Sequence, residues 1–275
     1  MEFDISDRAF GRIRKFIHEQ AGIHLGEGKK PLVCTRLARR LRANDLQCFD
    51  DYVMLLARPD AAAERQLAID LLTTNETYFF REPKHFEFIA RVLAARSRQA
   101  RPFRVWSAAS STGEEPYSVA MLLADKLSTD RPGTGNWEVF ASDISARVLE
   151  TARAGRYPLD RAGGIPTDYL KRYCLKGTGP ELGMLMVDPA LREHVRFEQV
   201  NLSRTLPRVG EFDLILLRNV MIYFDQDMKR EVVARLVEHL VPGGHLLVGH
   251  SETLNGVDDK LRAVSPSIYQ RPPLH

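Results

Sequence analysis

The sequence predicts an α/β protein whose doubly wound, mostly parallel sheet carries a small inserted antiparallel hairpin subdomain and follows an all-α N-terminal domain. Three observations predict this fold class: no strand-like alternation appears before about residue 103, apolar strands then alternate with helices, and a Gly- and Pro-rich stretch interrupts that alternation. We expect a helical domain at residues 1–75, a junction at 76–83 and an α/β domain at 84–275. The inserted β-subdomain is expected at about 157–194.

The first 75 residues show helical periodicity. Ser6 is the expected N-cap of the first helix. Apolar residues recur at helical spacing in three segments: Phe10, Ile13 and Ile17; Val33, Leu37 and Leu41; and Leu67, Leu71 and Leu72.

A basic run lies within the second of these segments. Between Lys29 and Arg42 there are six cations and no acid, although the whole chain carries a net charge of only +3. We predict that the arginines lie opposite the apolar stripe and bind a partner: Arg36, Arg39, Arg40 and Arg42. The alternative is a solvated helix face.

The remaining elements follow from residue 76. Pro83 suits the first position of a new helix, because its missing N–H is not needed there. Strands are expected at residues 103–109, 137–143, 195–202, 212–219 and 243–250, with SIYQR at 267–271 as a last antiparallel edge strand. Helices are expected near 117–127, 148–154 and 227–240.

Composition excludes several classes of protein. The three cysteines, Cys34, Cys48 and Cys174, form no C-x-x-C pair, which argues against a disulfide framework and a zinc site. The N-terminus has no apolar signal core, and no run approaches the roughly 18 apolar residues of a spanning helix. We therefore expect a cytoplasmic protein that does not insert into membranes.

The polar residues that follow the first strand are candidates for ligand binding, because ligands of open parallel sheets bind at the carboxyl ends of the strands. Residues 107–118 read SAASSTGEEPYS, which is not the G-x-G-x-x-G of a dinucleotide site. Glu114 and Glu115 would repel a pyrophosphate and suit a cationic group such as an ammonium. Alternatively, they are acids favoured by a helix dipole.

The later strand ends carry further candidates. Asp143 is placed to accept hydrogen bonds from ribose hydroxyls, or else to cap the next helix. The side-chain amide of Asn201 and a backbone N–H near Leu202 could read an adenine edge. Arg218 and Asn219 follow four apolar residues and are further candidates for the site. Alternatively, Asn219 is a turn residue.

Four motifs together resemble the CheR family of chemotaxis-receptor methyltransferases: NETYFFRE at 75–82, SAASSTGEEPYS at 107–118, RNVMIYF at 218–224 and GHSE at 249–252. The resemblance covers essentially the whole chain. It implies a helical domain joined to a doubly wound domain that binds S-adenosylmethionine, with a small antiparallel subdomain inserted.

The resemblance also implies roles for individual residues, with S-adenosylmethionine as cofactor, S-adenosylhomocysteine as product and no metal. Arg81 and Tyr223 would act at the methyl-transfer centre, and Arg81 would pair with a carboxylate of either the cofactor or the substrate. The implied cofactor-binding residues are Asn75, Thr77, Arg81, Glu115, Asp143, Asn201, Leu202, Arg218 and Asn219.

The implied reaction methylates glutamate side chains of chemotaxis receptors. Such a carboxylate, with a pKa of about 4.3, is already ionised at neutral pH and needs no general base. The arginine face would meet the acidic helical bundle of a receptor, and the hairpin could bind a receptor tail by strand addition. The enzyme would be cytoplasmic and recruited to receptor clusters, without a nucleic-acid partner.

Two alternatives keep the fold. The first is a methyltransferase that acts on nucleic acid or on a small molecule; methylation of nucleic-acid bases usually brings a [DNS]-P-P-[YFW] motif after the fourth strand, where this chain has RNVMIY. A sensor that binds S-adenosylmethionine without turnover would not need Arg81 and Tyr223.

Overall fold

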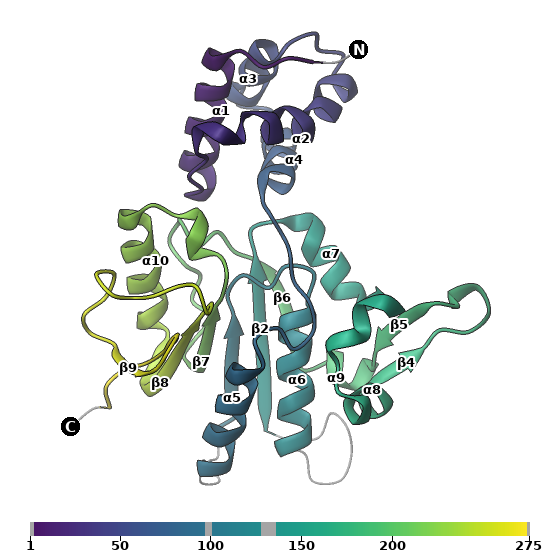
Figure 1. Cartoon of the computed structure of the whole chain (residues 1–275), viewed down its shortest axis with the longest axis vertical. Helices are drawn as coiled ribbons and strands as arrows, with labels where there is room; N and C mark the ends of the chain where they lie inside the picture. Colours follow the sequence, from purple (N-terminus) through teal and green to yellow (C-terminus); the bar gives the residue numbers. More distant parts are fainter. Residues whose placement is uncertain (1–2, 97–100, 128–135, 274–275) are drawn as a thin grey trace.

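The N-terminal part of the protein is a group of four helices (Figure 1). The computed structural model describes residues 3–96, 101–127 and 136–273. Ser6 caps the first helix, as predicted, by accepting a hydrogen bond from the Ala9 N–H at 3.0 Å. The helices are α1 (Asp7–Ala21), α2 (Lys30–Ala43), α3 (Phe49–Ala57) and α4 (Ala62–Leu72), and a 3₁₀ turn (Glu27–Lys29) precedes α2.

A seven-stranded sheet forms the centre of the rest of the chain. Its order is β6-β2-β1-β7-β8-β10-β9, and the five strands from β6 to β8 are parallel, whereas β10 runs antiparallel to both of its neighbours. The strands are β1 (Phe103–Ser107), β2 (Trp137–Asp143), β6 (Val195–Gln199), β7 (Phe212–Leu217), β8 (Leu240–Val248), β9 (Arg262–Ser265) and β10 (Ile268–Gln270).

Successive residues of the central strands enter two different hydrophobic cores, because side chains alternate across a sheet. Val105 packs in the core that contains α5 (Pro83–Ala95) and α6 (Glu114–Leu127). Trp106 packs in the core that contains α10 (Gln226–Glu238) and the helical domain. The predicted doubly wound α/β architecture is confirmed.

The inserted subdomain is a three-stranded antiparallel sheet of order β3-β5-β4, beside α6 in Figure 1. The predicted hairpin is present, and β3 adds a third strand to it. Its elements are β3 (Arg156–Pro158), a 3₁₀ segment (Leu159–Gly164), α8 (Thr167–Tyr173), β4 (Cys174–Lys176), a 3₁₀ turn (Gly179–Glu181) and β5 (Met184–Val187). The flanking helices are α7 (Ala146–Ala154) and α9 (Pro189–Arg192).

Several predicted boundaries are wrong. β8 begins at Leu240, directly after the cap of α10, and not at residue 243. The predicted edge strand near residue 268 is antiparallel, as expected, but β9 lies outside it. β9 is largely exposed and lacks apolar alternation, so its sequence carries no strand signal. Within the described ranges, no helix is both long and apolar enough to span a bilayer.

Candidate functional site

A cavity of about 160 Å³, measured as space open to the centres of water molecules, lies at the carboxyl ends of the parallel strands. The chain reaches it from the ends of β1, β2, β6 and β7, from the junction before α5, and from the helical domain. It brings together every residue predicted to bind the cofactor or to act at the methyl-transfer centre: Asn75, Thr77, Arg81, Glu115, Asp143, Asn201, Leu202, Arg218, Asn219 and Tyr223.

Asp143 ends β2 and is held in a fixed orientation. Its two carboxylate oxygens accept hydrogen bonds from the backbone N–H groups of Ser145 and Ser111, each at 2.9 Å. Burial raises the pKa of Asp143 above its ordinary value, and these N–H groups oppose that rise. The cap of α7 is Ser145, so the capping alternative for Asp143 is wrong. A buried acceptor at the cavity wall is suited to paired hydroxyl groups.

Glu115 and Arg218 form a buried ion pair on another part of the wall. Arg218 donates to Glu115 at 2.8 Å and to Glu82 at 3.1 Å, and its side chain is only 1% exposed. Glu115 also accepts a hydrogen bond from Ser107 at 2.7 Å. Burial raises the pKa of Glu115, and the charge of Arg218 opposes the rise. Arg218 therefore connects two acids, and its guanidinium is largely committed to them.

Only one of the two acids at the start of α6 lies at the cavity, whereas the sequence suggested both as candidates. Glu114 points away from the cavity: it accepts hydrogen bonds from Thr112 and from Arg161 of the inserted subdomain. Gly113 has φ +100°, and a Cβ there would lie 2.7 Å from the Tyr157 hydroxyl. The glycine thus serves packing against the inserted subdomain and not the close approach of a ligand.

Asn219 and the loop that follows it are fixed by Glu252, a residue that sequence reasoning did not single out. Asn219 has φ +58°, in the left-handed region, and its N–H donates to Glu252 at 2.8 Å. Glu252 also accepts from the N–H groups of Ile222, at 3.2 Å, and Gly249, at 2.7 Å. The GHSE motif could have indicated the role of Glu252, because a buried carboxylate needs several hydrogen-bond donors around it.

Arg81 and Tyr223 lie on the wall that reaches the surface. Arg81 donates to the Glu76 carbonyl at 3.0 Å, and its guanidinium lies 5.7 Å from the centre of the exposed Tyr78 ring. Tyr223 ends a 3₁₀ turn (Met221–Tyr223) whose middle residue, Ile222, is exposed. Both predicted residues are half-buried at the rim of the cavity.

Asn201 lines the cavity, but its side chain is already engaged. The amide donates to the Gln20 carbonyl at 2.6 Å, and its oxygen accepts from Ser203. These bonds tie α1 to the loop after β6 and use one of the two amide N–H groups, so contact of the other with an adenine edge stays a prediction. The backbone near Asn201 and Leu202 is a further place at which a ligand could bind.

The helical domain forms part of the cavity wall, which the sequence did not predict. The His24 N–H donates to the Tyr223 carbonyl at 2.7 Å, and Ile23 forms an isolated β-bridge with Phe224. Arg36 lines the cavity and donates to the carbonyls of Leu72 and Thr73. This domain is thus part of the site.

Two of the four arginines do not lie on the predicted solvent face. Arg40 forms a two-bond ion pair with Glu64, which also accepts from Tyr52 at 2.7 Å. At 100° per residue, positions 36 and 40 flank the apolar stripe of α2, whereas Arg39 and Arg42 lie opposite it and are exposed. The predicted uniform basic face is wrong for Arg36 and Arg40.

The chemistry of the cavity fits a nucleoside joined to an amino acid. Asp143 would accept hydrogen bonds from a ribose, and the apolar side chains of Ile144, Val200 and Leu202 would contact a base. The carboxylate of Glu115 would face an ammonium group. S-adenosylmethionine combines these three groups.

Comparison with known proteins gives the same answer. The family model "CheR methyltransferase, SAM binding domain" matches residues 75–269, and "CheR methyltransferase, all-alpha domain" matches residues 8–73. A "Chemotaxis protein methyltransferase" from Escherichia coli (strain K12) is 44% identical over 268 residues, 96% of this chain and 91% of that protein. Its counterpart in Salmonella typhimurium is 44% identical over 266 residues, 96% and 90% of the two chains. "Chemotaxis protein methyltransferase 2" from Pseudomonas aeruginosa is 41% identical over 269 residues, 98% and 94%.

Proposed function

The chain belongs to the CheR methyltransferase family, and from this premise we propose that it methylates glutamate side chains of chemotaxis receptors to give glutamyl methyl esters. Membership makes the chain an S-adenosylmethionine-dependent methyltransferase of a chemotaxis system. The proposal concerns the acceptor group, the receptor and the residues that act on them.

The rim of the cavity carries the proposal. The Arg81 cation and the Tyr223 side chain are half-buried there, and each has an exposed apolar side chain beside it. The Tyr78 ring, 50% exposed, lies 5.7 Å from the Arg81 guanidinium, and Ile222, 55% exposed, directly precedes Tyr223. A cation behind an apolar rim suits a carboxylate at the end of a short alkyl chain. A glutamate side chain on the surface of a protein partner has this form.

The residues of the chain would catalyse the reaction by position and charge. Asp143 would hold the ribose of S-adenosylmethionine, the backbone near Asn201 and Leu202 the adenine, and Asn75, Thr77, Glu115 and Asn219 the amino-acid part, with Arg218 orienting Glu115. When bound, the cofactor supplies a methyl group activated by its sulfonium. Arg81 would orient the acceptor carboxylate, and Tyr223 would help to exclude water. Correct alignment of two reactants can lower a barrier by about 7–11 kcal/mol.

Two surfaces are proposed to bind the receptor. Arg39 and Arg42 on α2 are exposed and would attract an acidic helical bundle. The outer strand of the inserted subdomain, β4, lies at a sheet edge, and Leu175 and Leu182 of its hairpin are 46% and 76% exposed. Such an edge can accept an extended receptor tail as a further strand.

A labelling experiment tests the acceptor group. Purified protein is incubated with methyl-labelled S-adenosylmethionine and the cytoplasmic fragment of a methyl-accepting chemotaxis receptor. We expect label on the receptor that mild alkali releases as methanol, because esters hydrolyse in alkali and N-methyl groups do not. A receptor fragment whose methylation-site glutamates are replaced by alanine is the matched control. Alkali-stable label, or label on the control, would contradict the proposal.

A further inference from the structure

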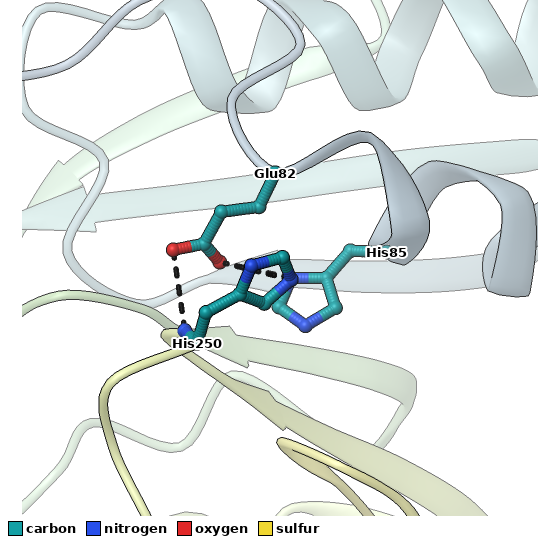
Figure 2. A group of neighbouring side chains, drawn as sticks. All are labelled: Glu82, His85 and His250. Atoms are coloured by element: carbon teal, nitrogen blue, oxygen red, sulfur yellow. Dashed lines mark hydrogen bonds and ion pairs between the residues drawn. The ribbon is translucent and has the colours of Figure 1, made fainter.

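Three side chains outside the cavity converge on one point (Figure 2). Glu82 and His85 come from the junction and first turn of α5, and His250 follows β8. One carboxylate oxygen of Glu82, Oε2, lies 3.3 Å from His85 Nδ1 and 3.9 Å from His250 Nε2. The three potential ligand atoms all lie within 4.8 Å of one another.

The hydrogen bonds of His85 indicate which of its ring nitrogens carries the proton. Its Nε2 lies 2.8 Å from the Ser267 hydroxyl, and that hydroxyl donates its single proton to the Pro266 carbonyl at 2.6 Å. The Ser267 oxygen therefore accepts from His85 Nε2–H. In the neutral ring, the lone pair then belongs to Nδ1.

That lone pair points at an oxygen that also carries lone pairs. Among the described residues, His85 Nδ1 has no hydrogen-bond partner, although the side chain is only 1% exposed. Burial disfavours the charged form of an imidazole, and the Arg218 guanidinium bonded to Glu82 acts in the same direction. A buried ring nitrogen without a proton that faces a carboxylate oxygen at 3.3 Å is unfavourable unless a cation lies between them.

The spacing and chemistry of the three groups fit a transition metal. Zinc bonds of about 2.0–2.1 Å place neighbouring ligands of a tetrahedral site about 3.3 Å apart, which is the distance between Glu82 Oε2 and His85 Nδ1. The His250 side chain is 44% exposed, so its ring can adjust its 3.9 Å distance. The bond from His85 to Ser267 is of the outer-shell type that orients metal-binding histidines.

The local charge permits a further cation. Arg218 already pairs with Glu82, but it also pairs with Glu115, so two carboxylates share one guanidinium. Glu82 itself has φ +60°, a left-handed conformation that is uncommon outside glycine. Such strain is often found where a side chain has a binding role.

We propose that Glu82, His85 and His250 form a binding site for a divalent transition-metal ion such as Zn²⁺. Two imidazole nitrogens and one carboxylate oxygen are suitable ligands for this class of ion. The ion ties the start of α5 to the end of β8. Glu82 also contacts Arg218 and Asn219 of the cavity wall, so the ion steadies that wall without entering the cavity.

The test titrates Zn²⁺ into full-length protein freed of metal by chelation and dialysis, and measures heat and stoichiometry. The wild type should bind one ion with a dissociation constant in the micromolar range or below. His250→Ala, a change at a half-exposed side chain, should weaken this binding at least tenfold. His18→Ala is the matched control, because His18 also lies beside a carboxylate, Asp225 at 2.9 Å, and its loss should leave the site unchanged.

The melting temperature is a second readout, and it does not depend on Zn²⁺ that binds elsewhere on the surface. Added Zn²⁺ should raise the melting temperature of the wild type and of His18→Ala, but not that of His250→Ala. If the wild type binds no Zn²⁺, or if His250→Ala binds and is stabilised equally, the proposal is wrong. His85 then donates an Nδ1–H to Glu82 as an ordinary buried hydrogen bond.

Discussion

Acidic side chains of this protein differ in pKa because their partners differ. In the part of the chain that the structure describes, Asp143 has only backbone N–H partners, and burial raises its pKa. Burial acts in the same direction on Glu64, but hydrogen bonds from Arg40 and Tyr52 outweigh it, so the pKa of Glu64 lies below its ordinary value. The first acid is held by two backbone N–H groups and keeps further lone pairs for a ligand at the cavity wall, whereas the second is a structural anion.

Asp143→Asn should weaken S-adenosylmethionine binding by more than tenfold. The amide keeps the size of the carboxylate but loses the charge, and charged hydrogen bonds contribute about 1.5–3 kcal/mol each. Calorimetry measures the affinity. The control is Asp125→Asn, at a half-buried acid of α6 that does not line the cavity. Equal affinities in wild type and Asp143→Asn would remove Asp143 from the site.

Arg81→Ala should lower receptor methylation at least tenfold and leave the melting temperature nearly unchanged. Within the described ranges the guanidinium makes one hydrogen bond, to the carbonyl of exposed Glu76, so the cost in unfolding free energy should stay within about 0.5 kcal/mol. Initial rates and thermal melts of the same preparation measure both effects. A destabilised variant with normal specific activity would show that Arg81 is structural.

At the scale of single elements, α2 serves both the interior and the surface. Its apolar stripe packs in the core, Arg36 and Arg40 bond to the rest of the domain, and Arg39 and Arg42 are exposed. Charge reversal therefore has different consequences at neighbouring positions.

Arg39→Glu with Arg42→Glu should slow receptor methylation and leave S-adenosylmethionine affinity unchanged, since neither residue lines the cavity. The wild-type rate should fall with salt as the Debye length drops from about 10 Å at 0.1 M to about 3 Å at 1 M, and the double variant should lose most of this dependence. Arg8→Glu with Arg12→Glu, at two exposed cations of α1, has the same charge change and is the control. If both double variants behave alike, no specific basic surface exists on α2.

Glu64→Gln should remove part of the acid sensitivity of the protein. Because the folded-state pKa of Glu64 is lowered, its stabilising effect is complete above the ordinary value of 4.5 and is lost as pH falls through the folded-state pKa. The wild type should therefore lose melting temperature more steeply than the variant below pH 4.5. Parallel slopes in that window would show that the bonds to Arg40 and Tyr52 contribute no pH-dependent stability.

The elements that sequence predicted best are those whose burial is local. Two examples are the buried stripe of Val33, Leu37 and Leu41 on α2 and the buried strand β7 (Phe212–Leu217). Both could be predicted because the burial of neighbouring residues leaves a regular apolar pattern in the sequence. β9 does not, since its residues are exposed and only pairing with β10 makes it a strand. The prediction for Arg40 was wrong for a similar reason: its ion-pair partner, Glu64, lies on another helix, so the sequence around Arg40 does not show the contact.

At the scale of the whole molecule, the residues at the strand ends of the site could be predicted, but the part of the chain that forms the opposite wall of the cavity could not. The ends of parallel strands must share one edge, so Asp143 and Arg218 had to lie near each other. Nothing local in the sequence shows that Ile23 and His24 would form the opposite wall. Their bonds are to the backbone of residues 223–224, and backbone bonds leave no side-chain pattern.

His24→Pro tests the importance of this wall. Proline removes the N–H that donates to the Tyr223 carbonyl, so the helical domain should hold the cavity less firmly and S-adenosylmethionine should bind several-fold more weakly. His24→Ala keeps the N–H and should bind more tightly than the proline variant. If the two variants bind equally, the backbone bond does not support the wall.

The bond between His24 and Tyr223 also constrains the order of events during synthesis. It joins positions separated by roughly 200 residues, a distance at which loop closure is slow and entropically costly. On the ribosome, the four N-terminal helices can form early from local contacts, but the surface that they present stays uncovered until Phe224 has emerged. A nascent chain therefore exposes this apolar surface, including buried Ile23 and Leu25, for most of its translation, and chaperones have that interval in which to bind it.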